Sequence, residues 1–251
     1  MQEQKEFRVN NAHVQHAKQA LRERVWDLLE CRRAAPTGVA GHIPDFGGKD
    51  VAADRLAQHP AWEAARVIKA VPDLAQLPVR IQALEDGKQL YMASPKLATQ
   101  NPFYYLDPAS LAVSPREAAA HRAAAKFARP VDLDEMPSVD LVVCGSVAVN
   151  REGARIGKGA GYSDIEVALL QEAGLLGPHT LIATTVHSLQ VLDEDLPETD
   201  HDFRVDLVIT PDETFECAPR GRRPGIIWDH LAPEVIAAIP VLESRRQAAG
   251  A

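Results

Sequence analysis

The chain has 251 residues, 46% of them hydrophobic and 25% charged, which suits one large α/β domain or two small ones with a real core. Its formal net charge of -8 argues against a free-standing nucleic-acid binder, because such proteins usually carry a basic excess. No stretch approaches the roughly 18 apolar residues of a transmembrane helix, and the amino-terminal residues lack the apolar core of a signal peptide. The three cysteines, Cys31, Cys144 and Cys217, form no CxxC pair, so neither a zinc site nor a disulfide framework is supported. We therefore expect a cytoplasmic protein with no nucleic-acid or membrane partner.

The first half of the chain alternates predicted helices with predicted strands. Apolar residues at helical spacing predict an amphipathic helix over residues 11–30, and its polar face carries Lys18 and Arg22. The segments 34–49 and 94–110, rich in glycine, proline or aromatic residues, are predicted to be loops. The other elements predicted here are helices over residues 50–58, 76–85 and 115–127 and strands over residues 67–71 and 89–93.

The second half has a clearer βαβ rhythm. A continuous apolar run over residues 139–149 is typical of a strand buried on both faces. A glycine-rich turn follows, and Ser163 and Asp164 are suitable caps for a helix that ends at Gly174. The remaining predictions are strands over 180–186 and 205–210 and a final helix over 234–244. The pattern predicts an α/β fold, a three-layer sandwich with a mostly parallel sheet. We expect one domain over residues 11–245 between flexible termini at 1–10 and 246–251.

The strongest site-like feature is the turn RIGKGAGY over residues 155–162, between a strand and a helix. Its three glycines let the backbone approach a phosphate, Arg155 and Lys158 supply charge, and the following helix offers free N–H groups. Neither the Walker pattern nor GxGxxG is satisfied, which disfavours a P-loop NTPase or an ordinary Rossmann enzyme. The turn is therefore either a phosphate site or a tight surface turn.

Several further residues have two interpretations each. Asp164 is a magnesium ligand or a plain helix cap, and Asp206 is a metal ligand or an ordinary acid on its strand. Lys18 and Arg22 lie one helical turn apart and either reach a phosphate tail or form a solvated basic face. We expect loop or core roles for the histidines and a small, inert apolar role for the cysteine in the first buried run; these residues are His187, His201 and Cys144.

An ordered series of motifs resembles the 5-formyltetrahydrofolate cyclo-ligase family, also called methenyltetrahydrofolate synthetase. The resemblance covers about residues 14–212. Its motifs are DLVVCGSVAV at 140–149, RIGKGAGYSD at 155–164, Gln190, Leu196-Pro197, His201-Asp202, VDLVIT at 205–210 and KQALR at 18–22. The resemblance implies a fold related to the ribose-phosphate isomerase and CoA-transferase group.

The resemblance also implies an ATP- and Mg²⁺-dependent ligase that converts 5-formyltetrahydrofolate, or a related folate-like substrate, to 5,10-methenyltetrahydrofolate. It assigns catalytic roles to Arg155 and Lys158 and magnesium binding to Asp164 and Asp206. The residues that it implies for ATP binding are Lys18, Arg22, Arg155, Gly157, Lys158, Gly159, Ala160, Gly161 and Tyr162. This chemistry depends on phosphate positioning more than on a protein nucleophile, and no nucleophile motif is present.

The sequence departs from the family pattern on the folate side. Ser163 and Ile165 stand where the family carries a tyrosine and an arginine, and GSVAVN at 145–150 replaces PGxAFD. No folate-contacting glutamate is evident near Arg80. This form is most similar to a divergent branch, the methenyltetrahydrofolate-synthetase-domain proteins. Two alternatives stay open: a non-catalytic nucleotide- or metabolite-binding paralogue, and an ATP-dependent enzyme acting on another heterocycle, such as a thiamine-related one.

Overall fold

The computed structural model describes residues 2–120, 125–218, 221 and 225–249. Its main sheet has the strand order β11-β10-β8-β5-β1-β2-β3-β4. The neighbours from β10 to β2 are parallel, whereas β3, β4 and β11 join antiparallel at the edges. A second, three-stranded sheet has the order β7-β6-β9. The mostly parallel α/β sheet predicted from the sequence is therefore confirmed.

The main sheet consists of β1 (Val67–Ala70), β2 (Gln89–Ala93), β3 (Phe103–Leu106), β4 (Arg129–Val131), β5 (Val139–Cys144), β8 (Leu176–Thr185), β10 (Leu207–Ile209) and β11 (Thr214–Glu216). The small sheet consists of β6 (Ala148–Asn150), β7 (Arg155–Ile156) and β9 (Val191–Leu192). The α-helices are α1 (Gln2–Cys31), α2 (Lys49–Ala57), α3 (Pro60–Ala64), α4 (Leu77–Glu85), α5 (Pro115–Ala118), α7 (Tyr162–Glu172), α8 (Pro233–Ala238) and α9 (Pro240–Ala249). Short 3-10 helices include η5 (Ser188–Gln190) and η6 (Trp228–His230).

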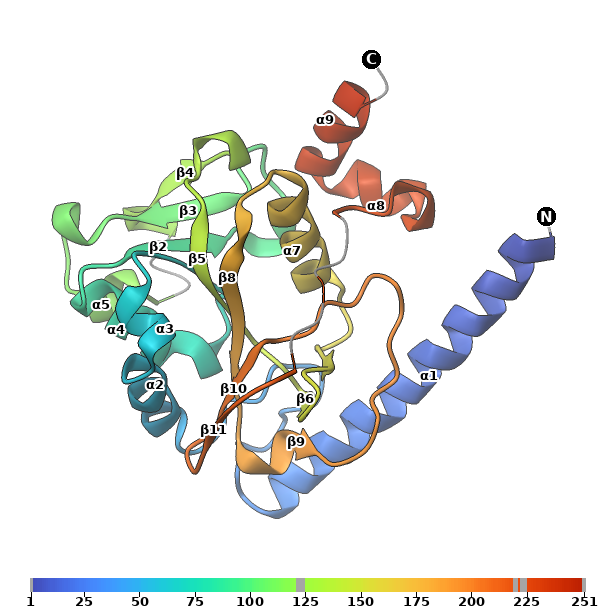
Figure 1. Cartoon of the computed structure of the whole chain (residues 1–251), viewed down its shortest axis with the longest axis horizontal. Helices are drawn as coiled ribbons and strands as arrows, with labels where there is room; N and C mark the ends of the chain where they lie inside the picture. Colours follow the sequence, from blue (N-terminus) through green and yellow to red (C-terminus); the bar gives the residue numbers. More distant parts are fainter. Residues whose placement is uncertain (1, 121–124, 219–220, 222–224, 250–251) are drawn as a thin grey trace.

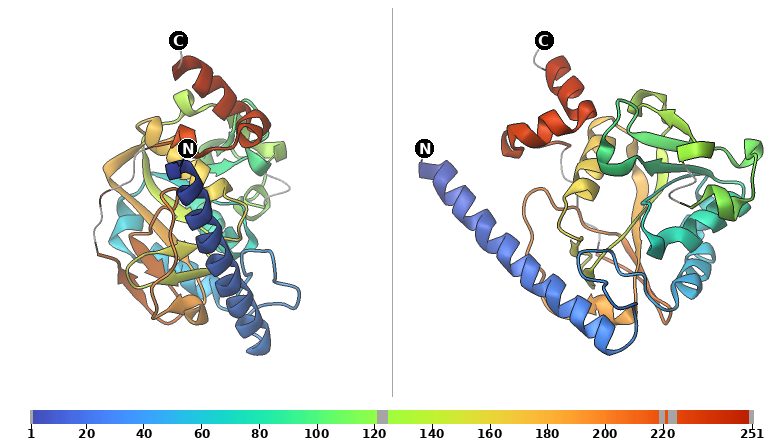
Figure 2. Two further views of the ribbon diagram at one scale, coloured as in Figure 1. Left: turned by 90° about the vertical axis from the view of Figure 1, so that its right-hand side faces the viewer. Right: turned by 180° about the vertical axis from the view of Figure 1, so that it is seen from behind.

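Helices cover both faces of the main sheet. Helices α2 to α5 lie on one face, and α7, α8 and α9 lie on the other, while the long helix α1 runs past the small sheet (Figures 1 and 2). Alternate residues of a strand point to opposite faces, so Ile68 and Ala70 join one apolar cluster and Val67 joins the other. None of the helices described is long and apolar enough for a membrane span. The relation to the ribose-phosphate isomerase group stays a prediction.

The predicted loop over residues 94–110 is wrong at its centre, because β3 lies there. Phe103 to Leu106 pair antiparallel with β2, and both end residues are fully buried. Aromatic residues favour strands, and the prolines at 102 and 108 flank β3 without interrupting its ladder. The prolines favour a loop, whereas the aromatic run between them favours the strand that the structure has.

The single strand predicted over residues 139–149 is also wrong. The chain leaves the main sheet after Cys144 and enters the small sheet at Ala148. At the break, a Cβ on Gly145 would lie 2.9 Å from Cγ2 of Ile43, so the backbone passes too close to a buried side chain for a larger residue. Apolar patterning cannot reveal such a change of sheet, because both segments are buried.

The helix ends differ from their predictions. Helix α7 begins at Tyr162 after the left-handed Gly161, so Ser163 and Asp164 lie in its first turn and are not its caps. The final predicted helix is two helices, because Pro240 starts α9 after an extended Ile239. Helix α1 begins at Gln2, although apolar spacing predicts a start at residue 11. Helix α5 ends at 118, and part of the predicted helix over 115–127 lies outside the described residues.

Candidate functional site

A cavity of about 940 Å³ opens between α1, the glycine-rich turn, the loop over residues 199–206 and the segment 225–235. This size is at the upper end of the range for small-molecule pockets, roughly 300–1,000 Å³. The turn and α7, from Tyr162 to Gln171, line the cavity together with residues of α1. The cavity therefore gathers the segments that carry the predicted site residues.

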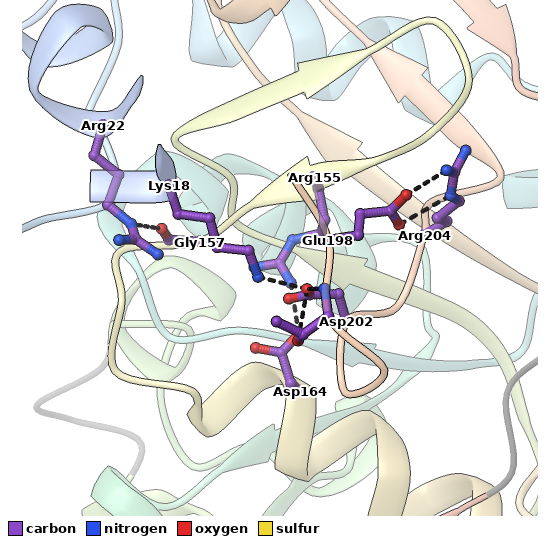
Figure 3. Close-up of polar contacts among 9 residues, drawn as sticks. Lys18, Arg22, Arg155, Gly157, Asp164, Glu198, Asp202 and Arg204 are labelled. Atoms are coloured by element: carbon purple, nitrogen blue, oxygen red, sulfur yellow. Dashed lines mark hydrogen bonds and ion pairs between the residues drawn. The ribbon is translucent and has the colours of Figure 1, made fainter. Parts of the chain in front are cut away.

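Helix α1 supplies two cations to this cavity. Lys18 and Arg22 share one helix face and are only 4% and 6% exposed, so the solvated basic face considered above is wrong. Arg22 Nε donates to the carbonyl of Gly157 at 2.7 Å, which ties the helix to the turn. Lys18 forms an ion pair with Asp202 from the opposite loop (Figure 3).

The glycine-rich turn runs from β7 to α7 and also contributes two cations. Its backbone has φ 101° at Gly159 and 74° at Gly161, conformations that favour glycine. Arg155 is buried and donates to Asp164 and to the carbonyl of Gly145, both at 3.2 Å. No acceptor lies within reach of its Nε among the described residues.

Lys158 sits at the open side of the turn. Its side chain is 40% exposed, and Nζ lies 3.0 Å from a carboxylate oxygen of Asp73, which follows β1. Arg80 in turn holds this acidic segment, since its guanidinium donates to the carbonyls of Val71 at 2.6 Å and Asp73 at 2.9 Å. Burial lowers the pKa of Arg80 to about 10. Arg80 therefore fixes the loop that follows β1, and this loop carries Asp73 into the cavity.

Five aspartates line the cavity: Asp73, Asp164, Asp200, Asp202 and Asp206. Burial raises the pKa of Asp164, with Arg155 opposing the shift and the charge of Asp202 adding to it. Burial also opposes ionisation of Asp202, but the charge and hydrogen bond of Lys18 and the hydrogen bonds of Thr199 outweigh it and lower the pKa. Asp206 lines the same cavity, and its carboxylate accepts from the N–H of Ile182 at 2.8 Å.

Asp202 is thus a site residue that the sequence predictions did not assign. The charge of its carboxylate adds to the raised pKa of Asp164. The only sequence signal was its place in the His201-Asp202 pair of the family resemblance. The loop is stiffened nearby by Arg204, whose Nε donates to Glu198 at 2.9 Å (Figure 3).

Three residues with predicted structural roles have separate outcomes. His187 starts η5, where its Nδ1 accepts from the N–H of Leu189 at 3.1 Å, so its loop role is confirmed. Burial raises the pKa of the Cys144 thiol, which agrees with the predicted inert role. His201 lies in a loop, as predicted, but it also lines the cavity and meets the ring of His230 edge-on at 5.0 Å between centroids.

The sequence model of the 5-formyltetrahydrofolate cyclo-ligase family matches residues 14–211. That match spans most of the chain and includes both α1 cations, the turn and all five aspartates that line the cavity. The chain belongs to this family. Membership supports a ligase-type enzyme linked to folate chemistry.

Similar proteins agree with this assignment. The chain is 40% identical over 240 residues to the methenyltetrahydrofolate synthase domain-containing protein of Mus musculus, covering 92% of this chain and 63% of that protein. The Homo sapiens protein of the same name is 34% identical over 237 residues, covering 92% and 61%. The chain therefore spans less than two thirds of these relatives. Because the match to the Mus musculus protein covers 92% of this chain, it extends past residue 211, where the family match ends.

The fold has a solved counterpart. The NMR structure of Aquifex aeolicus 5,10-methenyltetrahydrofolate synthetase superposes with a TM-score of 0.51 at 21% identity. The superposition covers 85% of this chain and 99% of that one. At this level of identity the likeness concerns the fold.

Proposed function

We propose that this chain is an ATP- and magnesium-dependent cyclo-ligase that converts 5-formyltetrahydrofolate, or a closely related substrate, to the 5,10-methenyl form. The observation that carries the proposal is the convergence of four cationic side chains on one cavity beside the start of α7. Lys18 and Arg22 come from α1, and Arg155 and Lys158 come from the glycine-rich turn. Because the chain belongs to this family, a phosphate-bearing ligand such as ATP is the best explanation of this convergence.

The phosphate-binding half of the proposal rests on charge and backbone geometry. The turn over residues 157–161 and the first N–H groups of α7 face the cavity, where a helix start favours anions. Lys158 is the most exposed of these cations, so its ammonium can exchange Asp73 for a phosphate oxygen at little cost. Arg22 supports the turn by donating a hydrogen bond to the carbonyl of Gly157.

The acidic residues fit magnesium. Carboxylate oxygens suit this ion, which usually takes one or two protein carboxylates together with substrate phosphates. No group of three acids, histidines or cysteines among the described residues could hold a metal by itself, which agrees with such a shared arrangement. Asp164 would hold the ion together with the predicted ligand Asp206 or with Asp202. When bound, magnesium would neutralise charge on the phosphate oxygens.

In the proposed reaction the formyl oxygen of the substrate attacks the terminal phosphorus of ATP, and the bond to the ADP oxygen breaks. N10 then attacks the formyl carbon and loses its proton, and the C–O bond breaks to release inorganic phosphate. The protein's task is to orient the phosphates and stabilise their charge, for which Arg155 and Lys158 are placed.

A second candidate is an ATP-dependent enzyme on another heterocycle, such as a thiamine-related one. The observation in its favour is the environment of Arg80, a buried cation that donates to the carbonyls of Val71, Asp73 and Ala119. Arg80 supplies no carboxylate to a folate, and the carboxylate of Asp73 in the same segment is paired with Lys158. The changes at Ser163 and Ile165, in the first turn of α7, point the same way.

The test is turnover of 5-formyltetrahydrofolate with MgATP, followed by methenyltetrahydrofolate absorbance, with ATP binding titrated in parallel. Clear turnover would establish the proposed reaction. ATP binding without turnover would favour the second candidate or a non-catalytic binding protein. ATP hydrolysis in the presence of another heterocycle would then support the second candidate, and its absence would support the non-catalytic protein. Absence of ATP binding would make the turn structural and overturn both proposals.

A further inference from the structure

One wall of the cavity comes from a segment that the family model does not match. That match ends at residue 211, whereas residues 225–235 follow β11 in the chain and include η6 and the start of α8. The side chains that this segment contributes to the cavity are Ile226, Ile227, His230, Leu231 and Val235. A part of the chain outside the shared family core thus forms part of the site.

The segment is held firmly on α7. A Cβ on Gly225 would lie 2.6 Å from Cβ of Glu172, so the backbone approaches the end of α7 as closely as a glycine permits. The N–H of Ile226 donates to the Glu172 carboxylate at 3.2 Å. Ile226 and Leu231 also pack against the apolar cluster that contains Leu169. These contacts make the segment a built wall of the cavity.

The chemistry of this wall differs from that of the phosphate end. Among the described residues of 225–235, those lining the cavity include no lysine, arginine or carboxylate. They offer aliphatic surface and the imidazole of His230, which meets the ring of His201 edge-on at 5.0 Å. Aliphatic and aromatic surfaces stabilise a flat ring by burial, and an imidazole can hydrogen-bond a ring nitrogen or carbonyl.

We propose that residues 226–235 form the ring-binding wall of the cavity, with His230 and its neighbour His201 selecting the heterocycle that the site accepts. This inference rests on the proposed function, because a ligand with a charged tail and a planar ring matches a cavity that holds both cationic side chains and an apolar wall. The ring is either the adenine of ATP or the ring system of the second substrate. Both share the same chemistry, and binding measurements separate them.

The experiment is calorimetric titration of the full chain with MgATP, inorganic tripolyphosphate and 5-formyltetrahydrofolate. His230→Ala and Val235→Asp alter the wall, and Val235 is 36% exposed, so its substitution perturbs folding little. Val51→Asp is the matched control, since Val51 is 51% exposed on α2 and does not line the cavity. Lys158→Ala alters the phosphate end.

We expect the wall variants to weaken one ring-containing ligand by about tenfold and to leave tripolyphosphate affinity within about twofold. Loss confined to MgATP identifies the adenine, and loss confined to 5-formyltetrahydrofolate identifies the second substrate. His230→Phe, which keeps a ring, should lose less than His230→Ala. If the parent binds tripolyphosphate and both wall variants bind every ligand like the control, the inference is overturned while the phosphate site stands. If the parent binds neither MgATP nor tripolyphosphate, the proposed function fails and the inference fails with it.

Discussion

Two buried ion pairs of this protein each consist of a lysine and a carboxylate, but their surroundings differ. Lys18 with Asp202 and Lys69 with Glu166 each join distant segments, and side-chain exposure is at most 11% in both pairs. Only the first pair lines the cavity. The second lies between β1 and α7, among the apolar residues of one face of the sheet.

The difference shows that burial of a charge does not by itself mark a functional site. Lys69 and Glu166 compensate each other in a closed environment, and the pair joins β1 to α7. Lys18 faces a cavity, so its ammonium can exchange a carboxylate for a ligand oxygen. Access to the cavity separates a binding residue from a structural one.

The largest effect that we expect is on stability, from Lys69→Met. Removal of one partner leaves Glu166 as an uncompensated buried charge, which costs about 3–5 kcal/mol in the free energy of unfolding. Urea denaturation measures this loss, and the folded fraction should keep its MgATP affinity. The double variant Lys69→Met/Glu166→Met should recover most of the loss. A single variant as stable as the parent would show that the pair contributes little.

The next effect is on turnover, from Asp164→Asn. If this carboxylate holds magnesium, the magnesium-dependent rate should fall by about 100-fold, or roughly 2.7 kcal/mol of transition-state stabilisation. The matched control is Asp134→Asn, whose side chain is 88% exposed and lies outside the cavity. A fall in thermal stability with an unchanged magnesium dependence would instead favour a purely structural role in the first turn of α7.

A smaller effect is expected from Lys158→Ala. Loss of one partly exposed phosphate contact should weaken MgATP binding by about tenfold, while stability should change by no more than about 0.5 kcal/mol. The pair with Asp73 is exposed enough for its loss to be tolerated. Isothermal titration measures the affinity, and an unchanged dissociation constant would remove Lys158 from the phosphate site.

The smallest effect concerns pH. The pKa of Asp202 is lowered in the folded protein, against the burial that opposes ionisation, by the charge and hydrogen bond of Lys18 and by Thr199. Its contribution to stability is therefore present above the unfolded-state pKa of about 3.9 and is lost as the pH falls through the lower folded pKa. Lys18→Met should reduce this loss, as measured by chemical denaturation between pH 6 and pH 3. An identical acid profile in parent and variant would contradict the assignment.

Much of the fold and half of the site could be predicted from the sequence alone. The strand β2 coincides with the predicted range, and α4 and α7 follow their periodic segments closely. The glycines of the turn were informative, because a left-handed backbone at Gly159 and Gly161 restricts the residue type locally. Lys18 and Arg22 shared a predicted helix face because helical spacing is also a local property.

Tertiary structure decided the remainder, because contacts between distant segments leave no periodic trace in the sequence. The break at Gly145 depends on the nearby side chain of Ile43, and the burial of Lys18 depends on a loop 184 residues away that carries Asp202. The apolar wall formed by residues 225–235 depends on the contact of this segment with Glu172 at the end of α7. The sequence by itself determined periodic elements such as α4, α7 and β2 and the glycine-rich turn. Only the tertiary structure decided which charged residues line the cavity and which are buried between β1 and α7, since packing sets burial and access to the cavity.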